Sequence, residues 1–158
     1  MHEMCDSRRK EAFAKAKEIK RNMMISTKGR YALRVMIDLA ENQKDSYLPL
    51  KEIAKRQNIS EKYLENILKI LVQSKLLIGL RGRGGGYRLT RAPEEYTVGG
   101  ILRLTEGTLA PVACLEQNVK ECPRRENCRT VPMWERLYYL INDYLDGVTL
   151  ADLMDEPR

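Results

Sequence analysis

The chain has 158 residues, four cysteines and a formal net charge of +6, and its length suits one domain or a small domain with an oligomerisation arm. No apolar run approaches the roughly 20 residues that a membrane-spanning helix needs, so the sequence predicts no membrane segment. The excess of basic residues favours an anionic partner such as double-stranded DNA.

Residues 1–23 form a charged N-terminal extension that lacks the apolar core of a secretory signal. They either form a short helix or precede the true start, because Met23 or Met24 opens directly onto the first predicted helix. Without a signal peptide, the protein is predicted to be cytoplasmic. Thiols stay reduced there, so clustered cysteines act as ligands or sensors more often than as structural disulfides.

Three helices are predicted next, with the spacing of a helix-turn-helix. The first begins after Thr27, the second covers residues 50–57, and the third runs from the N-cap Ser60 to about Ser74. A tight turn at Asn58 separates the second helix from the third. Helix-turn-helix motifs place the helix after this turn in the major groove of DNA, so the third helix is the predicted recognition helix.

A basic β-hairpin is predicted to follow at once. Residues 76–80 and 87–89 are strand-like, and the segment 81–86 between them is rich in glycine. From Lys75 to Arg91 the chain carries basic side chains and no acid. Such a hairpin is typical of the wing of a winged helix-turn-helix domain, because its glycines let the backbone approach a phosphate closely.

The C-terminal part is predicted to hold two helices separated by an irregular loop. Thr97 caps a short helix over residues 98–104, and residues 107–129 have no periodicity. A long helix then starts around Pro132 and ends at Gly147. Its apolar stripe is too wide for a lone surface helix, so part of it is predicted to be buried against a second subunit.

The predicted fold is therefore mainly α with a small β-hairpin wing. A winged helix-turn-helix DNA-binding domain covers residues 24–106, and a cysteine-rich loop covers residues 107–130. A dimerisation helix and a C-terminal tail occupy residues 131–158.

Nine residues are predicted to contact DNA. The first turn of the recognition helix enters the major groove, and Glu65 can accept a hydrogen bond from a cytosine amino group. Arg83 at the tip of the wing suits a narrow minor groove. The alternatives are that Tyr63 is a core residue, that Glu65 is a solvated charge and that the wing is a plain surface hairpin. The predicted contacts are Lys28, Arg30, Ser60, Lys62, Tyr63, Glu65, Arg81, Arg83 and Arg88.

Three of the four cysteines, Cys114, Cys122 and Cys128, are clustered with the spacing C-x7-C-x5-C. Zinc sites generally use cysteine pairs with two to four residues between them, and no such pair occurs here. Longer spacings suit a loop around a larger cofactor such as an iron–sulfur cluster, which is held by thiolates. Free redox-active thiols and an atypical zinc site are the alternatives.

Several motifs together resemble the Rrf-two family of winged-helix regulators. They are MISTKGRYALRVMIDLA, the wing RGRGGGYRL, the following TVGGILRLTEG, and the cysteine pattern before PMWERL, and the resemblance extends from about Met24 to Leu153. It implies a homodimer crossed through the long C-terminal helix. The three cysteines point to the cluster-binding branch, which implies a 2Fe–2S cluster, in preference to 4Fe–4S, bound by Cys114, Cys122 and Cys128.

The chain departs from this branch at the fourth cluster ligand. The iron–sulfur cluster regulator uses a histidine three residues after its third cysteine, where this chain has Val131. The nitric-oxide-sensing repressor uses an aspartate from the first helix of the partner subunit, where this chain has Arg30. The candidates for the fourth ligand are then Glu126, Glu121, an exogenous thiol or water.

The leading functional hypothesis is a dimeric transcriptional repressor that is switched by an iron–sulfur cluster. A second hypothesis is a DNA-binding regulator whose thiols respond directly to oxidants. A third is an interaction module that regulates an enzyme of cysteine or cluster biosynthesis. No nucleophile–base pair or paired carboxylates appear in the sequence, so an enzyme is not predicted.

Overall fold

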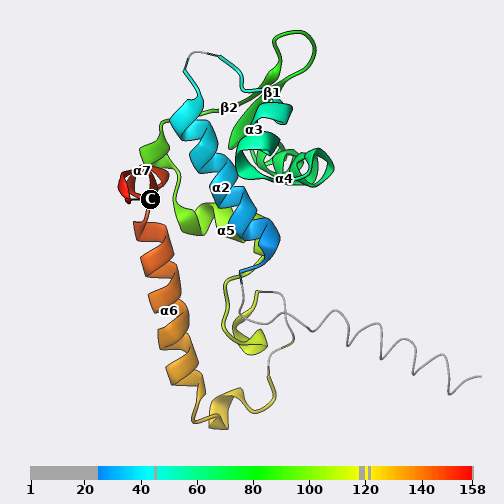
Figure 1. Ribbon diagram of the computed structural model, residues 1–158. Helices are drawn as coiled ribbons and strands as arrows, with labels where there is room; N and C mark the ends of the chain where they lie inside the picture. Colours follow the sequence, from blue (N-terminus) through cyan, green and yellow to red (C-terminus); the bar gives the residue numbers. More distant parts are fainter. Residues whose placement is uncertain (1–24, 45, 118–119, 121, 158) are drawn as a thin grey trace, which may run out of the picture.

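The structure is a computed structural model that describes residues 25–44, 46–117, 120 and 122–157. The extension over residues 1–23, with Cys5, lies outside the described residues. The fold is mostly helical with one antiparallel hairpin, which confirms the predicted fold class (Figure 1). Its elements are α2 (Thr27–Asn42), α3 (Leu50–Gln57), α4 (Glu61–Gln73), β1 (Leu77–Leu80), β2 (Gly86–Leu89), α5 (Val98–Glu106), α6 (Val131–Gly147) and α7 (Leu150–Asp155).

Local capping signals set the bounds of the first three helices. The Ser26 hydroxyl accepts a hydrogen bond from the Gly29 N–H, and the Ser60 hydroxyl accepts one from the Tyr63 N–H. Asn58 ends α3 with a left-handed backbone (φ +53°), a conformation that asparagine tolerates better than most residues. The turn between α3 and α4 therefore forms where the sequence predicts it.

The core lies where α2, α3 and α4 meet. Burying each large apolar side chain there contributes about 1.5–3 kcal/mol relative to leaving it in water. Because the inward face of α4 is held in this core, its outward face has a defined direction relative to the wing. Fully buried core residues include Ala32, Val35, Met36, Leu39, Ile53, Leu64, Ile67, Leu68 and Leu71.

The wing is a hairpin of two four-residue strands, in which Leu77 pairs with Leu89 and Leu80 pairs with Gly86. A further bridge joins β2 to the segment before α3, since Leu48 and Tyr87 exchange two backbone hydrogen bonds of 2.9 Å. At the tip, Gly82 and Gly84 have φ values of +93° and +75°. Residues other than glycine rarely adopt this backbone, so these glycines allow the tight turn.

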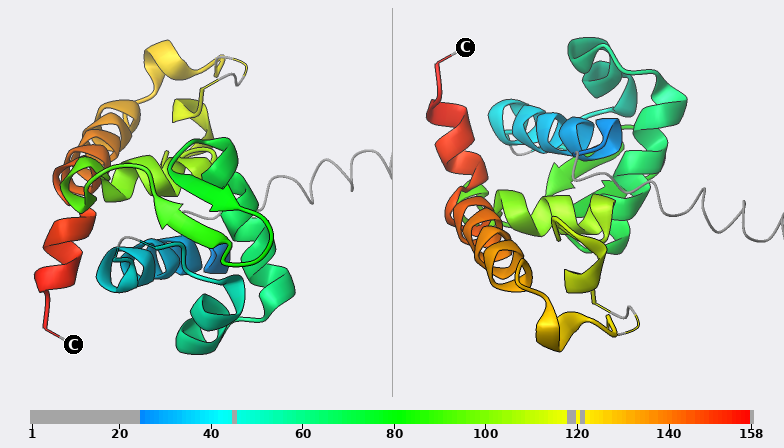
Figure 2. Two further views of the ribbon diagram at one scale, coloured as in Figure 1. Left: turned by 90° about the horizontal axis from the view of Figure 1, so that it is seen from above. Right: turned by 90° about the horizontal axis from the view of Figure 1, so that it is seen from below.

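Helix α6 is fastened to α5 near its C-terminal end. Arg103 donates hydrogen bonds to the Asp146 carboxylate, at 2.8 Å from Nη1, and to the Asn142 side chain at 2.9 Å. The hydrogen bond with Asp146 raises the pKa of Arg103. From this attachment α6 extends on the side of the molecule away from α4 (Figures 1 and 2). The loop before α6 therefore lies at the opposite end of the molecule from the wing.

The chain forms one more helix after Gly147, where the sequence analysis expected a tail. Thr149 and Asp152 cap α7 reciprocally, because the Thr149 N–H and hydroxyl both donate to the Asp152 carboxylate at 2.8 Å. These hydrogen bonds, the backbone one first, lower the pKa of Asp152. Leu150 is fully buried in the main core. The segment after α6 thus returns to the DNA-binding domain.

Candidate DNA interface and cysteine loop

The exposed start of α4 carries most of the predicted recognition residues. Ser60, Lys62 and Glu65 are exposed. Tyr63 is half-buried, and its ring packs edge-to-face on Tyr31 with centroids 5.9 Å apart. Tyr63 therefore supports the position of α4 on α2, as the core alternative predicted, and its contact with DNA stays a prediction.

The contact between Tyr31 and Tyr63 places the first turn of α2 beside the first turn of α4. Lys28 and Arg30 both belong to this turn of α2, and Arg30 is exposed and donates a hydrogen bond to the Thr27 hydroxyl at 3.1 Å. Two cations therefore lie near the predicted recognition helix, where they can contact the DNA backbone.

The wing exposes its three predicted arginines, Arg81, Arg83 and Arg88. The Arg88 guanidinium lies 5.2 Å from the centre of the Tyr47 ring, a cation–π distance. A hollow of about 600 Å³ separates the wing from α4, and its lining includes Glu61 and Glu65. Arg81 of the wing also lines this hollow, together with Lys51 and Lys69, so the hollow carries both acidic and basic side chains.

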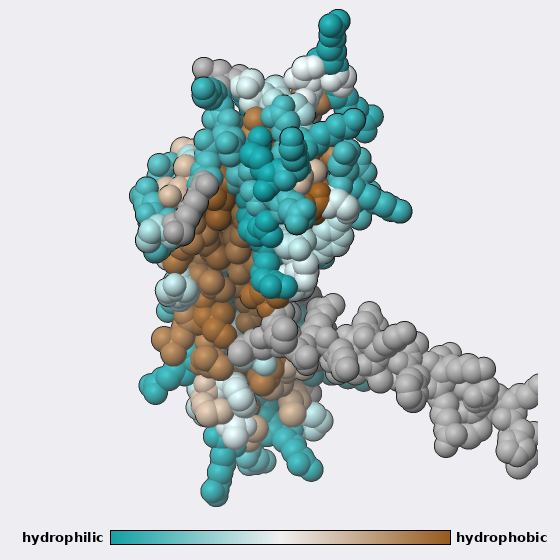
Figure 3. Space-filling model, viewed as in Figure 1, coloured by the Kyte–Doolittle hydropathy of each residue, from teal (hydrophilic) through white to brown (hydrophobic). Residues whose placement is uncertain are grey.

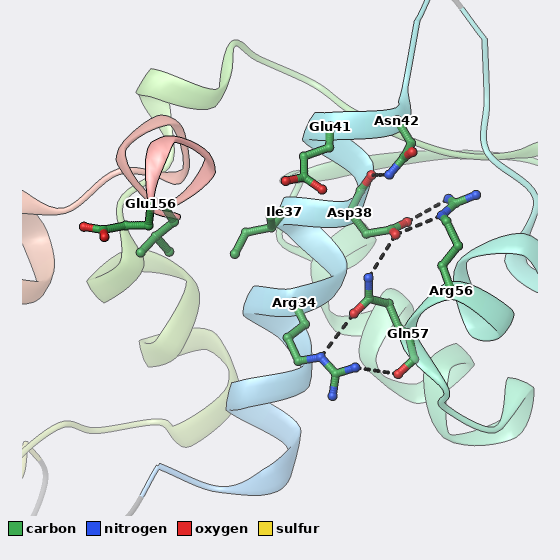
Figure 4. Close-up of a pocket in the computed structure, with 9 residues that line it drawn as sticks. Arg34, Ile37, Asp38, Glu41, Asn42, Arg56, Gln57 and Glu156 are labelled. Carbon is green, nitrogen blue, oxygen red and sulfur yellow. Dashed lines mark hydrogen bonds and ion pairs between the residues drawn. The ribbon is translucent and has the colours of Figure 1, made fainter. Parts of the chain in front are cut away.

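A polar cluster that was not predicted from the sequence joins α2 to α3 (Figure 4). Asp38 is 3% exposed and accepts hydrogen bonds from Arg56 at 2.9 and 2.7 Å and from Gln57 at 2.9 Å. Arg34 also bonds the side chain of Gln57 at 3.1 Å. The one signal in the sequence is Asp38 itself, an acid beside Leu39 in an otherwise apolar stripe. The cluster holds α3, the first helix of the helix-turn-helix, against α2.

This cluster lines a surface cavity of about 800 Å³ that α7 borders on its other side, through Leu153 and Glu156 (Figure 4). Among the described residues, every buried side-chain nitrogen and oxygen has a hydrogen-bond partner. The polar groups at the bottom of this cavity are therefore satisfied by the protein itself.

The cysteine loop carries three free, partly exposed thiols at Cys114, Cys122 and Cys128. Cys114 lies in a short 3-10 helix (Ala113–Leu115), and Cys128 directly follows another (Arg125–Asn127). The Cys128 sulfur is 3.3 Å from the Thr130 hydroxyl. This hydrogen bond, together with backbone hydrogen bonds, lowers the pKa of the Cys128 thiol.

Arg125 ties the loop to α6. Its guanidinium donates to the Cys114 carbonyl at 3.2 Å and to the Glu135 carboxylate at 2.6 Å. Cys114, Arg125 and Glu135 line one small cavity of about 310 Å³. The first cysteine is therefore linked, through one side chain, to the second turn of α6.

The three free thiols of this loop are of the chemical type that binds an iron–sulfur cluster, because such clusters are held by cysteine thiolates. In the described part of the chain, however, no three histidine, cysteine or acidic side chains converge on a metal site. Of the candidate fourth ligands, Glu126 is exposed and Glu121 lies outside the described residues.

A family model named Rrf2 and described as an iron-dependent transcriptional regulator matches residues 25–156. The chain belongs to the Rrf2 family. The HTH-type transcriptional regulator CymR of Bacillus subtilis is 40% identical over 131 residues, which are 83% of this chain and 89% of CymR. The regulator IscR of Erwinia tasmaniensis is 35% identical over 133 residues, 84% of this chain and 79% of IscR.

Comparison with solved structures leads to the same family. The solved structure of CymR, the global cysteine regulator of B. subtilis, has a TM-score of 0.69 at 38% identity and covers 85% of this chain and 98% of that chain. The relatives are DNA-binding transcriptional regulators and not enzymes, which confirms the predicted class for this Rrf2 chain. No helix among the described residues has the length and apolar character to span a membrane.

Replacing Arg83 by alanine is expected to weaken binding to specific and random DNA to the same degree, because we expect its guanidinium to contribute affinity that does not depend on the base sequence. Each lost phosphate contact should reduce the slope of log affinity against log salt by about 0.9. The measurement is a salt titration with a random duplex and with an operator selected from a random library by the wild-type protein.

Arg124→Ala is the control, since it removes the same charge from an exposed position in the loop before α6, at the opposite end of the molecule from the wing. If the double variant Arg83→Ala, Arg88→Ala bound the selected operator as tightly as wild type at physiological salt, the wing would not be a DNA contact.

Proposed function

We propose that this Rrf2 regulator is a homodimeric repressor whose affinity for double-stranded DNA changes when an iron–sulfur cluster binds Cys114, Cys122 and Cys128. The observation that carries the proposal is the position of the cysteine loop. It begins where α5 leaves the DNA-binding domain at Gly107 and ends where α6 starts at Val131. A change in the loop therefore acts directly on the start of α6.

An apolar face of α6 supports the homodimer. Met133, Tyr139, Leu140 and Tyr144 are 54–71% exposed, and apolar side chains form a continuous band over α6 and the adjoining part of the body (Figure 3). Only Val131 of the whole helix is buried. A stable helix with so large an exposed apolar face needs a partner, and a second copy gives the two recognition helices that two half-sites require.

The loop residues have distinct roles in this proposal. The three cysteines are the ligands, and Arg125 holds the backbone of Cys114 against Glu135 of α6. When bound, an iron–sulfur cluster supplies a centre that oxidants can change or remove. Closing the loop moves the cysteine backbone relative to α6. The cluster changes operator affinity only if it binds the form of the protein that is competent to bind DNA more tightly, or less tightly, than the form that is not.

The test is reconstitution of the purified protein with iron and sulfide under anaerobic conditions. Cys114→Ala, Cys122→Ala and Cys128→Ala should each lose the visible absorption and the bound iron and sulfide, and should share one altered operator affinity. Cys5→Ala is the matched control and should keep both. A full complement of iron and sulfide after loss of any loop cysteine contradicts the ligand assignment, and equal operator affinity with and without the cluster contradicts its regulatory role.

A second candidate is a thiol-based regulator without a cluster. Two observations favour it: the ligating side chains in the described part of the chain do not converge on a metal site, and one relative is named a global cysteine regulator. In that case the anaerobic protein would take up no iron, while treatment with hydrogen peroxide would change operator affinity in wild type and leave it constant in a variant without loop cysteines.

A further inference from the structure

The hydroxyl of Tyr96 closes the base of the wing. Tyr96 is 2% exposed, and its hydroxyl accepts hydrogen bonds from the Thr90 N–H at 2.9 Å and from the Arg91 N–H at 2.8 Å. The same hydroxyl donates to the Leu76 carbonyl at 3.0 Å. Leu76 directly precedes β1 and Thr90 directly follows β2, so the Tyr96 hydroxyl joins the entry and the exit of the hairpin. The Thr90 hydroxyl joins the same two segments, because it lies 2.9 Å from the Lys75 carbonyl, 3.2 Å from the Leu76 carbonyl and 3.1 Å from the Tyr96 hydroxyl.

The backbone of the same residue is joined to the end of α6. The Tyr96 carbonyl accepts a hydrogen bond from the Leu150 N–H at 3.0 Å, and the Val98 N–H donates to the Val148 carbonyl at 2.9 Å. Thr97 and Thr149 form an antiparallel bridge between these two bonds. The segment between β2 and α5 thus pairs with the connection between α6 and α7, beside which it passes in Figure 1.

We propose that Tyr96 is a positioning residue that couples the wing to the dimerisation arm, which is helix α6. Its side chain binds the wing base and its backbone binds the connection that follows α6. The arm is also held to α5 at this end, because Arg103 bonds Asp146 and Asn142. Any rotation of α6 about this attachment is therefore transmitted to residues 148–150, then to Tyr96 and to the orientation of the wing arginines.

The coupling does not depend on a cluster. It requires only that the wing contributes to DNA affinity and that α6 moves as a unit. A failure of cluster binding would therefore leave it intact, and a failure of the coupling would leave the cluster proposal intact. The coupling also explains why residues after Gly147 return to the DNA-binding domain.

Tyr96→Phe is the direct test, because it removes one oxygen atom and keeps the buried ring. The variant should fold, since the buried ring stays in place and only the hydrogen bonds of one hydroxyl are lost. The amides of Thr90 and Arg91 should exchange with solvent faster, and affinity for the selected operator should fall about 5- to 10-fold, within the usual range of coupling between sites. Amide exchange is followed by NMR and affinity by titration.

Two controls separate positioning from a general loss of stability. Ile53→Val shortens a fully buried side chain of α3 and should lower the denaturation midpoint slightly. It should leave operator affinity and the exchange of the Thr90 amide unchanged. Tyr87→Phe removes a hydroxyl from the wing itself and should leave the exchange of both amides unchanged. If Ile53→Val reduced operator affinity as much as Tyr96→Phe does, Tyr96 would be only a structural residue.

A double-mutant cycle tests the link to the arm. Asp146→Asn weakens the ion pair with Arg103 and should reduce operator affinity in the wild-type background. In the Tyr96→Phe background the same change should have little further effect, because the route to the wing is already broken. Effects on affinity that simply multiply in the double variant would overturn the proposed coupling.

Discussion

Replacing Leu140 and Tyr144 together by aspartate is expected to give a folded monomer that has lost about 100- to 10,000-fold in affinity for a two-half-site operator, the usual range of a bivalent advantage. Leu140 is 60% exposed and Tyr144 is 71% exposed in the single chain. Their side chains contribute little to the fold of one subunit, so charges there should disrupt the interface between two copies. Sedimentation measures the assembly, and titration with the selected operator measures the affinity.

The choice of residues matters because α6 uses another face for its own subunit. Ile141 and Leu145 pack against Val98 and Leu102 of α5, so aspartate at those positions would destabilise the monomer itself. The conservative variant Leu140→Met, Tyr144→Phe keeps the apolar face and should remain dimeric. A stable dimer formed by the aspartate variant would contradict α6 as the dimer interface.

Asp38→Ala is expected to lower the free energy of unfolding by about 2 kcal/mol. A hydrogen bond to a charged group contributes about 1.5–3 kcal/mol, and Asp38 accepts three such bonds. We expect a loss smaller than the sum of these three hydrogen-bond energies, because the Arg56 side chain is 33% exposed and water can replace part of the lost interaction. Urea denaturation at pH 7 measures the change as a lower midpoint at constant slope.

Glu52→Ala is the matched control for Asp38→Ala. Glu52 also pairs with Arg56, but at 3.6 Å and with its side chain 58% exposed. Exposed pairs of this kind contribute about 0.2–1 kcal/mol, so its removal should change stability little. If the two variants were equally stable, the buried carboxylate would not hold α2 to α3.

The local parts of the helix-turn-helix were predictable because their signals lie within a few residues. Ser60 caps α4 through a bond to the Tyr63 N–H three residues away, and Asn58 turns the chain within the motif. The bounds of α3 equal the predicted ones. α7 has an equally local signal, the reciprocal cap of Thr149 and Asp152, but few apolar residues lie between that cap and the end of the chain.

The candidate site residues could be chosen from the sequence, but their arrangement could not. Composition and spacing led to Arg83 and the three cysteines, because arginines on a glycine-rich hairpin suit phosphate and clustered thiols suit a metal, and these roles stay predictions. The distance between one thiol and another depends on how residues 107–130 fold, and this segment has no periodicity. The bond of Arg125 to both Cys114 and Glu135 is likewise absent from any local pattern.

The sequence by itself thus determined the family, the helix-turn-helix, the wing and the apolar character of α6, because helical periodicity, caps and glycine-rich turns act over short distances. Only the tertiary structure decided which apolar face of α6 serves its own subunit, that Asp38 is held by Arg56, and that Tyr96 joins the wing to Leu150. These contacts link residues far apart in the chain. Their partners are chosen by packing of the whole core, which no short window of sequence contains.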